Sequence, residues 1–330
     1  MKRNKYIFVL LLLISISVVL LSGTFFYVKH NNKLNSKNED TVHVLTSCNP
    51  VYIAALNVLG DVDGYTVENL SQPTTGCLHD YTLTTEDMKK LSQADVLIVN
   101  GGGMEGYLDD VIKAYPDLKI INTYEYVEQS FLGGDSLLIT EEEDEDAEDT
   151  EHEEAEEHHH HDEGANSHIW MDERIFELQV GAIAMSIDPN PNREDRPITN
   201  NMKSYIDELQ NDIDKQGLDK ELAGQNVAIL HEAFAYTAQS LGANVVATMD
   251  LDEERQVSAG EVSSFIQEIN EHDVKVVFAE YDYGKAMGDL IEEQTDAKVV
   301  YLETLVHGNY SSSDYVSVMN ENYKKIKSIF

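Results

Sequence analysis

Eight short runs rich in β-branched and other apolar residues constrain the fold of this 330-residue chain most strongly. Four lie in the first half, at 43–47, 65–70, 95–100 and 118–122, and four in the second, at 226–231, 244–249, 274–279 and 298–302. Helical patterns separate the runs, and strands that alternate with helices form parallel α/β sheets. Because about 100 residues separate the two sets, we predict two (β/α)4-type α/β lobes rather than one eight-stranded barrel.

Two features occupy the interval between the predicted lobes. Residues 139–167 contain 15 Asp or Glu and five His but no Lys or Arg. Such a composition cannot bury enough apolar surface to fold, so we predict a mobile acidic, His-rich loop. An amphipathic helix is expected at 171–186, and a longer polar helix then stands where a rigid connector would lie. We therefore expect an N-terminal lobe at 42–190, a linking helix at 191–217 and a C-terminal lobe at 218–330.

The N-terminus predicts a location outside the cytoplasm. Residues 7–28 are uncharged and follow three basic residues, and as a helix they would span about 33 Å, enough to cross a bilayer. Basic residues beside a membrane span stay on the cytoplasmic side, so the chain after this segment should lie outside the cytoplasm. Residues 1–28 therefore predict a membrane anchor or uncleaved signal, followed by a polar tether at 29–41. Cleavage, which would leave the protein secreted, is the alternative. In an oxidising compartment we expect a Cys48–Cys77 disulfide, with two unrelated buried thiols as the alternative.

The charge balance excludes one large class of partners. The chain carries 61 acidic and 23 basic residues, a formal net charge of −38, and nucleic-acid binding requires clustered Lys and Arg. Imidazoles among carboxylates suit borderline divalent ions, so the acidic loop predicts weak, exchangeable metal binding, with a solvated spacer as the alternative. The histidines concerned are His152, His158, His159, His160 and His161.

Four further residues lie at predicted strand exits or in the loops beyond them: His79, His168, His231 and Glu303. In parallel α/β sheets these carboxyl-end loops converge on the ligand crevice. Three neutral imidazoles and one carboxylate would fit a four-coordinate zinc site. Taken singly, each histidine could equally be a surface or hydrogen-bonded residue, and Glu303 could cap the segment that follows it.

The motifs around these residues resemble a known family. They are GCLHDYTLTTEDM, LSQADVLIVNGGGMEGYLDD, HIWMD after the acidic loop, LHEAFAYTAQSLG, FAEYDYGKAM and AKVVYLETL. From about Val42 to its C-terminus the chain resembles the zinc and manganese solute-binding proteins of bacterial ABC transporters. The resemblance implies two α/β lobes joined by a long helix, with the metal site in the cleft between them. It implies His79, His168, His231 and Glu303 as ligands, with Glu280 as the alternative carboxylate.

The resemblance also implies a function. The protein would capture Zn²⁺ outside the cytoplasm and deliver it to an ABC permease and its ATPase, as a monomer and without enzymatic activity. Manganese-type members place a carboxylate where this chain has His231, so a third imidazole favours zinc over Mn²⁺. A manganese-binding member, an extracellular zinc hydrolase and a metal-buffering adhesin remain alternatives. The hydrolase would use Glu232 or Glu280 as a base, but residue 235 is Ala, so the H-E-x-x-H spacing is missing.

Overall fold

The computed structural model describes residues 41–71, 81–132, 136–139, 165–189, 196–215, 217–251 and 257–330. Val42–Phe330 belong to one compact unit. Within the described ranges, no helix combines the length and the apolar character needed to cross a membrane. The predicted anchor at 7–28 lies outside these ranges and stays a prediction.

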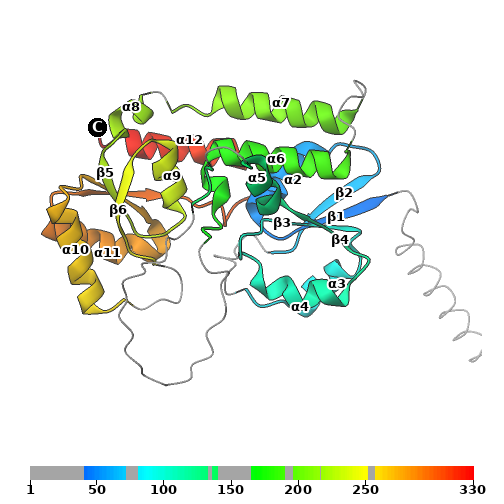
Figure 1. Ribbon diagram of the computed structural model, residues 1–330, viewed down its shortest axis with the longest axis horizontal. Coiled ribbons are helices and arrows are strands. Elements are labelled where there is room, and N and C mark those ends of the chain that lie inside the picture. The colour runs from blue at the N-terminus through cyan, green and yellow to red at the C-terminus, as the bar shows by residue number, and fades with distance from the viewer. Residues whose placement is uncertain are drawn as a thin grey trace, which may run out of the picture. The chain divides into compact units, whose positions relative to one another are not determined.

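Two four-stranded parallel sheets confirm the predicted class of two α/β lobes (Figure 1). The strand order is β2-β1-β3-β4 in the first sheet and β6-β5-β7-β8 in the second, so both sheets have the same topology. In each, the chain reverses its direction of strand addition between the two central strands, where α/β sheets bind ligands. The strands are β1 (Val42–Thr46), β2 (Tyr65–Asn69), β3 (Val96–Val99), β4 (Lys119–Asn122), β5 (Asn226–Ile229), β6 (Asn244–Thr248), β7 (Val276–Glu280) and β8 (Lys298–Leu302).

The sequence explains which strands are central. Every residue of β3 and β7 is buried, because a strand covered on both faces needs a continuous apolar run. The edge strand β8 instead alternates between buried and more exposed positions. This difference decides how the residues at the strand ends are oriented.

Helices connect the strands in both halves. They are α2 (Asn49–Leu59), α3 (Thr85–Leu91), α4 (Asp109–Ala114), α5 (Thr123–Ser130), α6 (Glu173–Ile187), α7 (Pro197–Asp212), α8 (Leu218–Leu222), α9 (Phe234–Ser240), α10 (Ala259–Glu271), α11 (Tyr281–Gln294) and α12 (Asp314–Lys327). Both α3 and α10 begin with a capping box, formed by Thr84 with Asp87 and by Ser258 with Glu261, which satisfies their first backbone N–H groups.

The predicted connector contains α7, which contacts α2 and α6 (Figure 1). The helix expected at 171–186 is α6, preceded by one turn of 3₁₀ helix at Ile169–Met171. Residues 190–195 and 216 lie outside the described ranges, so the predicted lobe boundaries stay predictions.

One hydrophobic core joins the two sheets. A single cluster of buried side chains contains Val44 and Ile98 from the first sheet and Val227 and Phe278 from the second. Two smaller clusters contain the other buried side chains of each sheet. Separating the sheets would expose the shared cluster to water, so burial of apolar surface opposes rigid-body movement of one sheet away from the other.

Trp170 connects the two halves of the chain. Its indole Nε1 donates a hydrogen bond of 2.7 Å to the carbonyl of Thr304, beyond β8. Its own carbonyl accepts a hydrogen bond of 2.7 Å from the Tyr315 hydroxyl of α12. The Tyr315 ring stacks on Phe176 of α6, with 3.6 Å between ring centroids. Thr304, near the start of the segment between β8 and α12, is thereby held against the 3₁₀ turn, and Tyr315, just after that segment, against α6.

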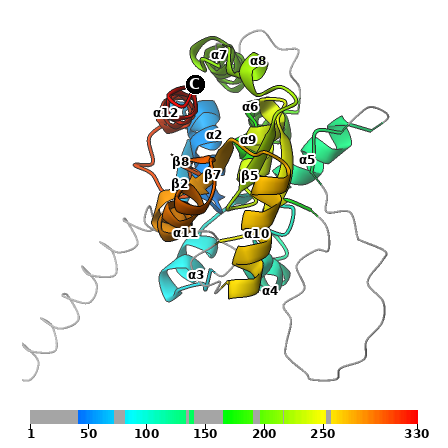
Figure 2. The same ribbon diagram turned by 90° about the vertical axis from the view of Figure 1, so that its left-hand side faces the viewer.

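That segment also contacts the start of α2. Asn49 Nδ2 donates a hydrogen bond of 2.8 Å to the carbonyl of Leu305, and Figure 2 shows α12 beside α2. Leu305 and Tyr310 have positive φ angles of 67° and 57°. L-residues rarely adopt this region, so surrounding contacts must stabilise it.

We expect Tyr315→Phe to lower the free energy of unfolding by about 1–2 kcal/mol, because the buried carbonyl of Trp170 loses its donor while the ring stacking on Phe176 remains. Burial raises the pKa of Tyr315, so its hydroxyl stays protonated and able to donate. Tyr281→Phe, at a residue that is 56% exposed, is the control and should cost less than about 0.5 kcal/mol. Urea unfolding measures both variants, and equal stabilities would contradict the importance of this junction.

Candidate metal centre

Two of the predicted ligands lie at the carboxyl ends of the adjacent central strands β5 and β7. His231 follows β5 by two residues, and Glu280 is the last residue of β7. Both side chains are buried, and His231 Nδ1 lies 3.5 Å from Glu280 Oε2. The other carboxylate oxygen, Oε1, accepts a hydrogen bond of 2.8 Å from Thr304 Oγ1. The carboxylate is thus oriented beside the imidazole.

His168 reaches the same place from the first half of the chain. It is fully buried and directly precedes the 3₁₀ turn at Ile169–Met171. The preceding carbonyl, of Ser167, accepts a hydrogen bond of 2.8 Å from Asn100 Nδ2, just beyond β3. The His168 ring meets His231 edge to face, with 4.9 Å between ring centroids and 77° between ring planes. The two halves therefore bring two imidazoles into contact at the switch points of their sheets.

The structure does not bring Glu303 to these histidines. Its side chain is 53% exposed and lies 3.5 Å from Lys325 Nζ, measured from Oε1. Glu303 follows the buried Leu302, and the alternation of the edge strand β8 continues into it. Glu280, at the end of a wholly buried strand, is the carboxylate beside His231. Of the two predicted carboxylates, Glu280 is therefore the one that contacts His231, and which of them is a metal ligand stays a prediction.

The remaining predicted ligands lie outside the described ranges. His79 falls within 72–80, and the five loop histidines fall within 140–164. Among the residues that the structure does describe, no group of three or more His, Cys, Asp or Glu side chains is arranged to hold a metal ion. The described part of the centre is therefore a pair of imidazoles with neighbouring carboxylates.

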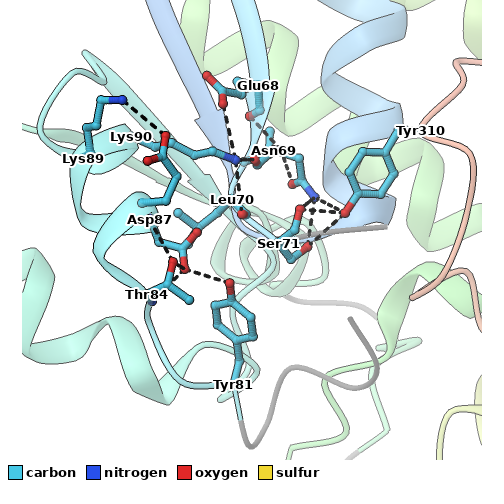
Figure 3. A network of polar contacts seen from close by, with 12 residues as sticks. Glu68, Asn69, Leu70, Ser71, Tyr81, Thr84, Asp87, Lys89, Lys90 and Tyr310 are labelled. Carbon is cyan, nitrogen blue, oxygen red and sulfur yellow. Dashed lines mark hydrogen bonds and ion pairs between the residues drawn. The ribbon is translucent and has the colours of Figure 1, made fainter. Parts of the chain in front are cut away.

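Polar contacts hold the chain on both sides of 72–80 (Figure 3). Before this segment, the carbonyl of Ser71 accepts a hydrogen bond of 2.7 Å from the Tyr310 hydroxyl. After it, the Tyr81 hydroxyl donates a hydrogen bond of 2.8 Å to Asp87, which also caps α3. Since Tyr310 belongs to the segment between β8 and α12, the second half of the chain contacts the residue that leads towards His79.

The described residues at the two ends of the predicted acidic loop (139–167) are hydrogen-bonded to each other. The backbone N–H of Asn166 donates to the carbonyl of Ile139 at 3.0 Å. The Tyr236 hydroxyl of α9 donates to the carbonyl of Asn166 at 2.9 Å, and the N–H of Ile139 donates back to that hydroxyl at 3.2 Å. Burial raises the pKa of Tyr236, so its hydroxyl remains a donor. Both ends of the acidic segment are therefore attached beside His168.

Reasoning from the sequence missed two contacts of His168, one with Asn166 and one with Glu232, which was considered only as a general base. Glu232 Oε1 lies 3.1 Å from His168 Nδ1, and Asn166 Oδ1 lies 3.3 Å from the same atom. The one sequence feature that could have pointed to these residues is their closeness to the predicted ligands. Asn166 precedes His168 by two residues, and Glu232 follows His231 directly. Imidazole nitrogens surrounded by carboxylate oxygens can bind a borderline divalent cation.

The structure describes only one of the two cysteines of the predicted disulfide. Cys48 is buried at the N-cap of α2, whereas Cys77 lies within 72–80, outside the described ranges. The Cys48–Cys77 bridge stays a prediction.

Comparison with known proteins gives consistent matches. A model of the family described as ZnuA, zinc-uptake complex component A, periplasmic, matches residues 44–329. The chain is 25% identical over 297 residues to the high-affinity zinc uptake system protein ZnuA of Bacillus subtilis, and the match covers 87% of each chain. It is 23% identical over 298 residues to the zinc-binding protein AdcA of Streptococcus pyogenes serotype M1. That match covers 88% of this chain but 56% of AdcA, so the chain spans only part of this longer relative.

Solved structures share the fold. The structure of the solute-binding protein FpvC of Pseudomonas aeruginosa in complex with Mn²⁺ matches with a TM-score of 0.68 and 19% sequence identity. The match covers 88% of this chain and 98% of FpvC.

If Glu280 supplies the carboxylate of the centre, Glu280→Gln should weaken Zn²⁺ binding by about 100-fold or more, beyond the 10–100-fold typical of residues that only orient a ligand. Glutamine keeps an oxygen that can accept from Thr304, so the fold should persist. Glu303→Gln is the matched control and should bind as the wild type does. Competition with a chromogenic zinc chelator measures both, and the reverse pattern would assign the carboxylate to Glu303.

Proposed function

Since the chain belongs to the family of the periplasmic zinc-uptake complex component A, we propose that it is the extracytoplasmic zinc-binding component of a metal ABC importer. Its members are metal-binding solute-binding proteins of ABC transporters. In this proposal the protein captures Zn²⁺ and passes it to a membrane permease powered by an ATPase, acts as a monomer and catalyses no reaction. The uncharged segment at 7–28 would tether it to the membrane.

The observation that carries the proposal is the contact between His168 and His231 beside Glu280. In a tetrahedral zinc site with bonds of about 2.0–2.1 Å, two ligand atoms lie about 3.3 Å apart. The 3.5 Å between His231 Nδ1 and Glu280 Oε2 is close to that spacing. The described side chains do not form a three-ligand group as they stand, so we propose His168 and His231 as ligands that Glu280 would join when the ion binds, with His79 as the fourth on the resemblance of its motif.

The ligand types favour zinc as the transported ion. Three imidazoles and one carboxylate suit zinc, whereas manganese prefers a larger share of carboxylate oxygens. The zinc-binding names of ZnuA and AdcA support the same choice. The Mn²⁺ complex of FpvC supports the alternative, a manganese-binding member of the family.

The acidic, His-rich segment would collect zinc weakly before it reaches the buried centre. The hydrogen bond between Asn166 and Ile139 attaches this segment two residues before His168. Tethering raises the effective concentration of loosely bound zinc near the buried ligands. Because the two sheets share a core, release at the permease would come from local rearrangement around the ligands rather than from separation of the lobes.

The extracellular hydrolase is less well supported. In this proposal Glu280 is a ligand and Glu232 contacts His168, so both carboxylates suggested as general bases have another role. A metal-buffering adhesin would have the same binding site, and only an uptake measurement with the permease separates it from a transport protein.

The purified full chain should bind one Zn²⁺ tightly, and His79→Ala or His231→Ala should each weaken that binding by about 100-fold or more, because each removes a ligand to the ion. Isothermal titration with Zn²⁺, and separately with Mn²⁺, measures the affinities and should give zinc the higher one. His272→Ala removes an exposed histidine that pairs with Glu268 and should change nothing. Tight binding retained in both ligand variants would contradict the site.

Deletion of 141–163 should leave the tight site intact, because Ile139 and Asn166 are already joined by a hydrogen bond and a short linker can replace the segment. Uptake by cells should slow only when zinc is scarce, since the segment would act by raising the local zinc concentration. Titration of the purified variant and a zinc-limited uptake assay test the two parts. Loss of the tight site would show that the segment supplies a ligand.

A further inference from the structure

Two acceptor oxygens face the same nitrogen of His168. Nδ1 lies 3.1 Å from Glu232 Oε1 and 3.3 Å from Asn166 Oδ1. A carboxylate and an amide oxygen accept hydrogen bonds but cannot donate them. The neutral ring is therefore most stable with its proton on Nδ1, which leaves the lone pair on Nε2.

Other contacts fix the orientation of the Asn166 amide. Its Oδ1 also accepts from the backbone N–H of His168 at 3.0 Å, and its Nδ2 donates to the carbonyl of Glu232 at 2.9 Å. A flipped amide would place donor against donor and acceptor against acceptor, so this orientation is the one that satisfies all partners. Asn166 is buried, at 4% exposed.

We infer that Asn166 and Glu232 are positioning residues that hold the His168 ring in its Nδ1–H tautomer and present Nε2 to the transported divalent cation. The inference rests on the proposed function for the identity of the cation, but the tautomer is a property of the metal-free protein. Partners that orient a histidine ligand in this way typically change metal affinity by 10–100-fold when removed. Glu232 thereby acts through His168 and not on the ion or as a base.

Glu232→Ala tests the inference, and Glu232→Gln is its conservative partner because a glutamine oxygen can still accept from Nδ1–H. Glu232 is 28% exposed, so both variants should fold. Glu268→Ala is a matched control, since Glu268 forms a His–Glu contact of 3.2 Å with the exposed His272. Long-range ¹H–¹⁵N spectra of the metal-free full chain report the tautomer of each histidine, and His168→Gln identifies the signal of His168.

We expect the Nδ1–H tautomer in the wild type, a shift towards Nε2–H in Glu232→Ala and recovery in Glu232→Gln. Zinc affinity should fall by about 10–100-fold in Glu232→Ala, return to within a few-fold in Glu232→Gln and stay unchanged in Glu268→Ala. An Nε2–H tautomer in the wild type, or a Glu232→Ala variant that binds zinc as tightly as the wild type, would overturn the inference. A wild-type protein that binds no zinc would instead overturn the proposed function. The inference about Asn166 and Glu232 would then be tested by the tautomer of His168 in the metal-free protein alone.

Discussion

Burial of one apolar cluster against both sheets is the constraint on which the rest of the structure depends. Side chains of both sheets share this cluster with α6 and α12, and the contacts of Trp170 and Tyr315 lie within it. The two sheets have the same strand order; Asn100, just beyond β3, holds the carbonyl that precedes His168, and His231 lies beyond β5. His168 and His231 meet there as a consequence of how the core is filled.

The same constraint shapes how a bound ion could be exchanged. Parting the sheets would expose a large apolar area, at roughly 25 cal/mol for each Å². Breaking the contacts around one ligand costs less free energy than parting the sheets, because each of these contacts involves only a few hydrogen bonds. Under the proposed function, the polar contacts of Asn166, Tyr310 and Tyr81 are therefore the places where small rearrangements could alter the proposed ligand set.

Much of this was predictable from the sequence, and the exceptions have physical reasons. Apolar runs that alternate with helical patterns predicted the eight strands and the two lobes, because the spacing of apolar residues along the chain follows which side chains are buried. The motifs singled out His168 and His231, whose rings the structure brings into contact. Whether Glu280 or Glu303 lies beside His231 depends on which strand is central and which is an edge, and strand order is set by contacts distant in sequence. Asn166 was not singled out, and Glu232 was considered only as a general base, because their contacts with His168 exist only in the folded chain.

The bridge between Ile139 and Asn166 has a consequence for how this protein can change over evolutionary time. Closing a chain between two fixed points costs entropy that grows only with the logarithm of its length, so doubling an insertion there adds about 0.6 kcal/mol. Insertions or deletions of acidic and histidine codons at this point would leave the rest of the fold nearly unaffected. Under the proposed function, the amount of zinc that this segment collects could therefore change without changing the buried ligands.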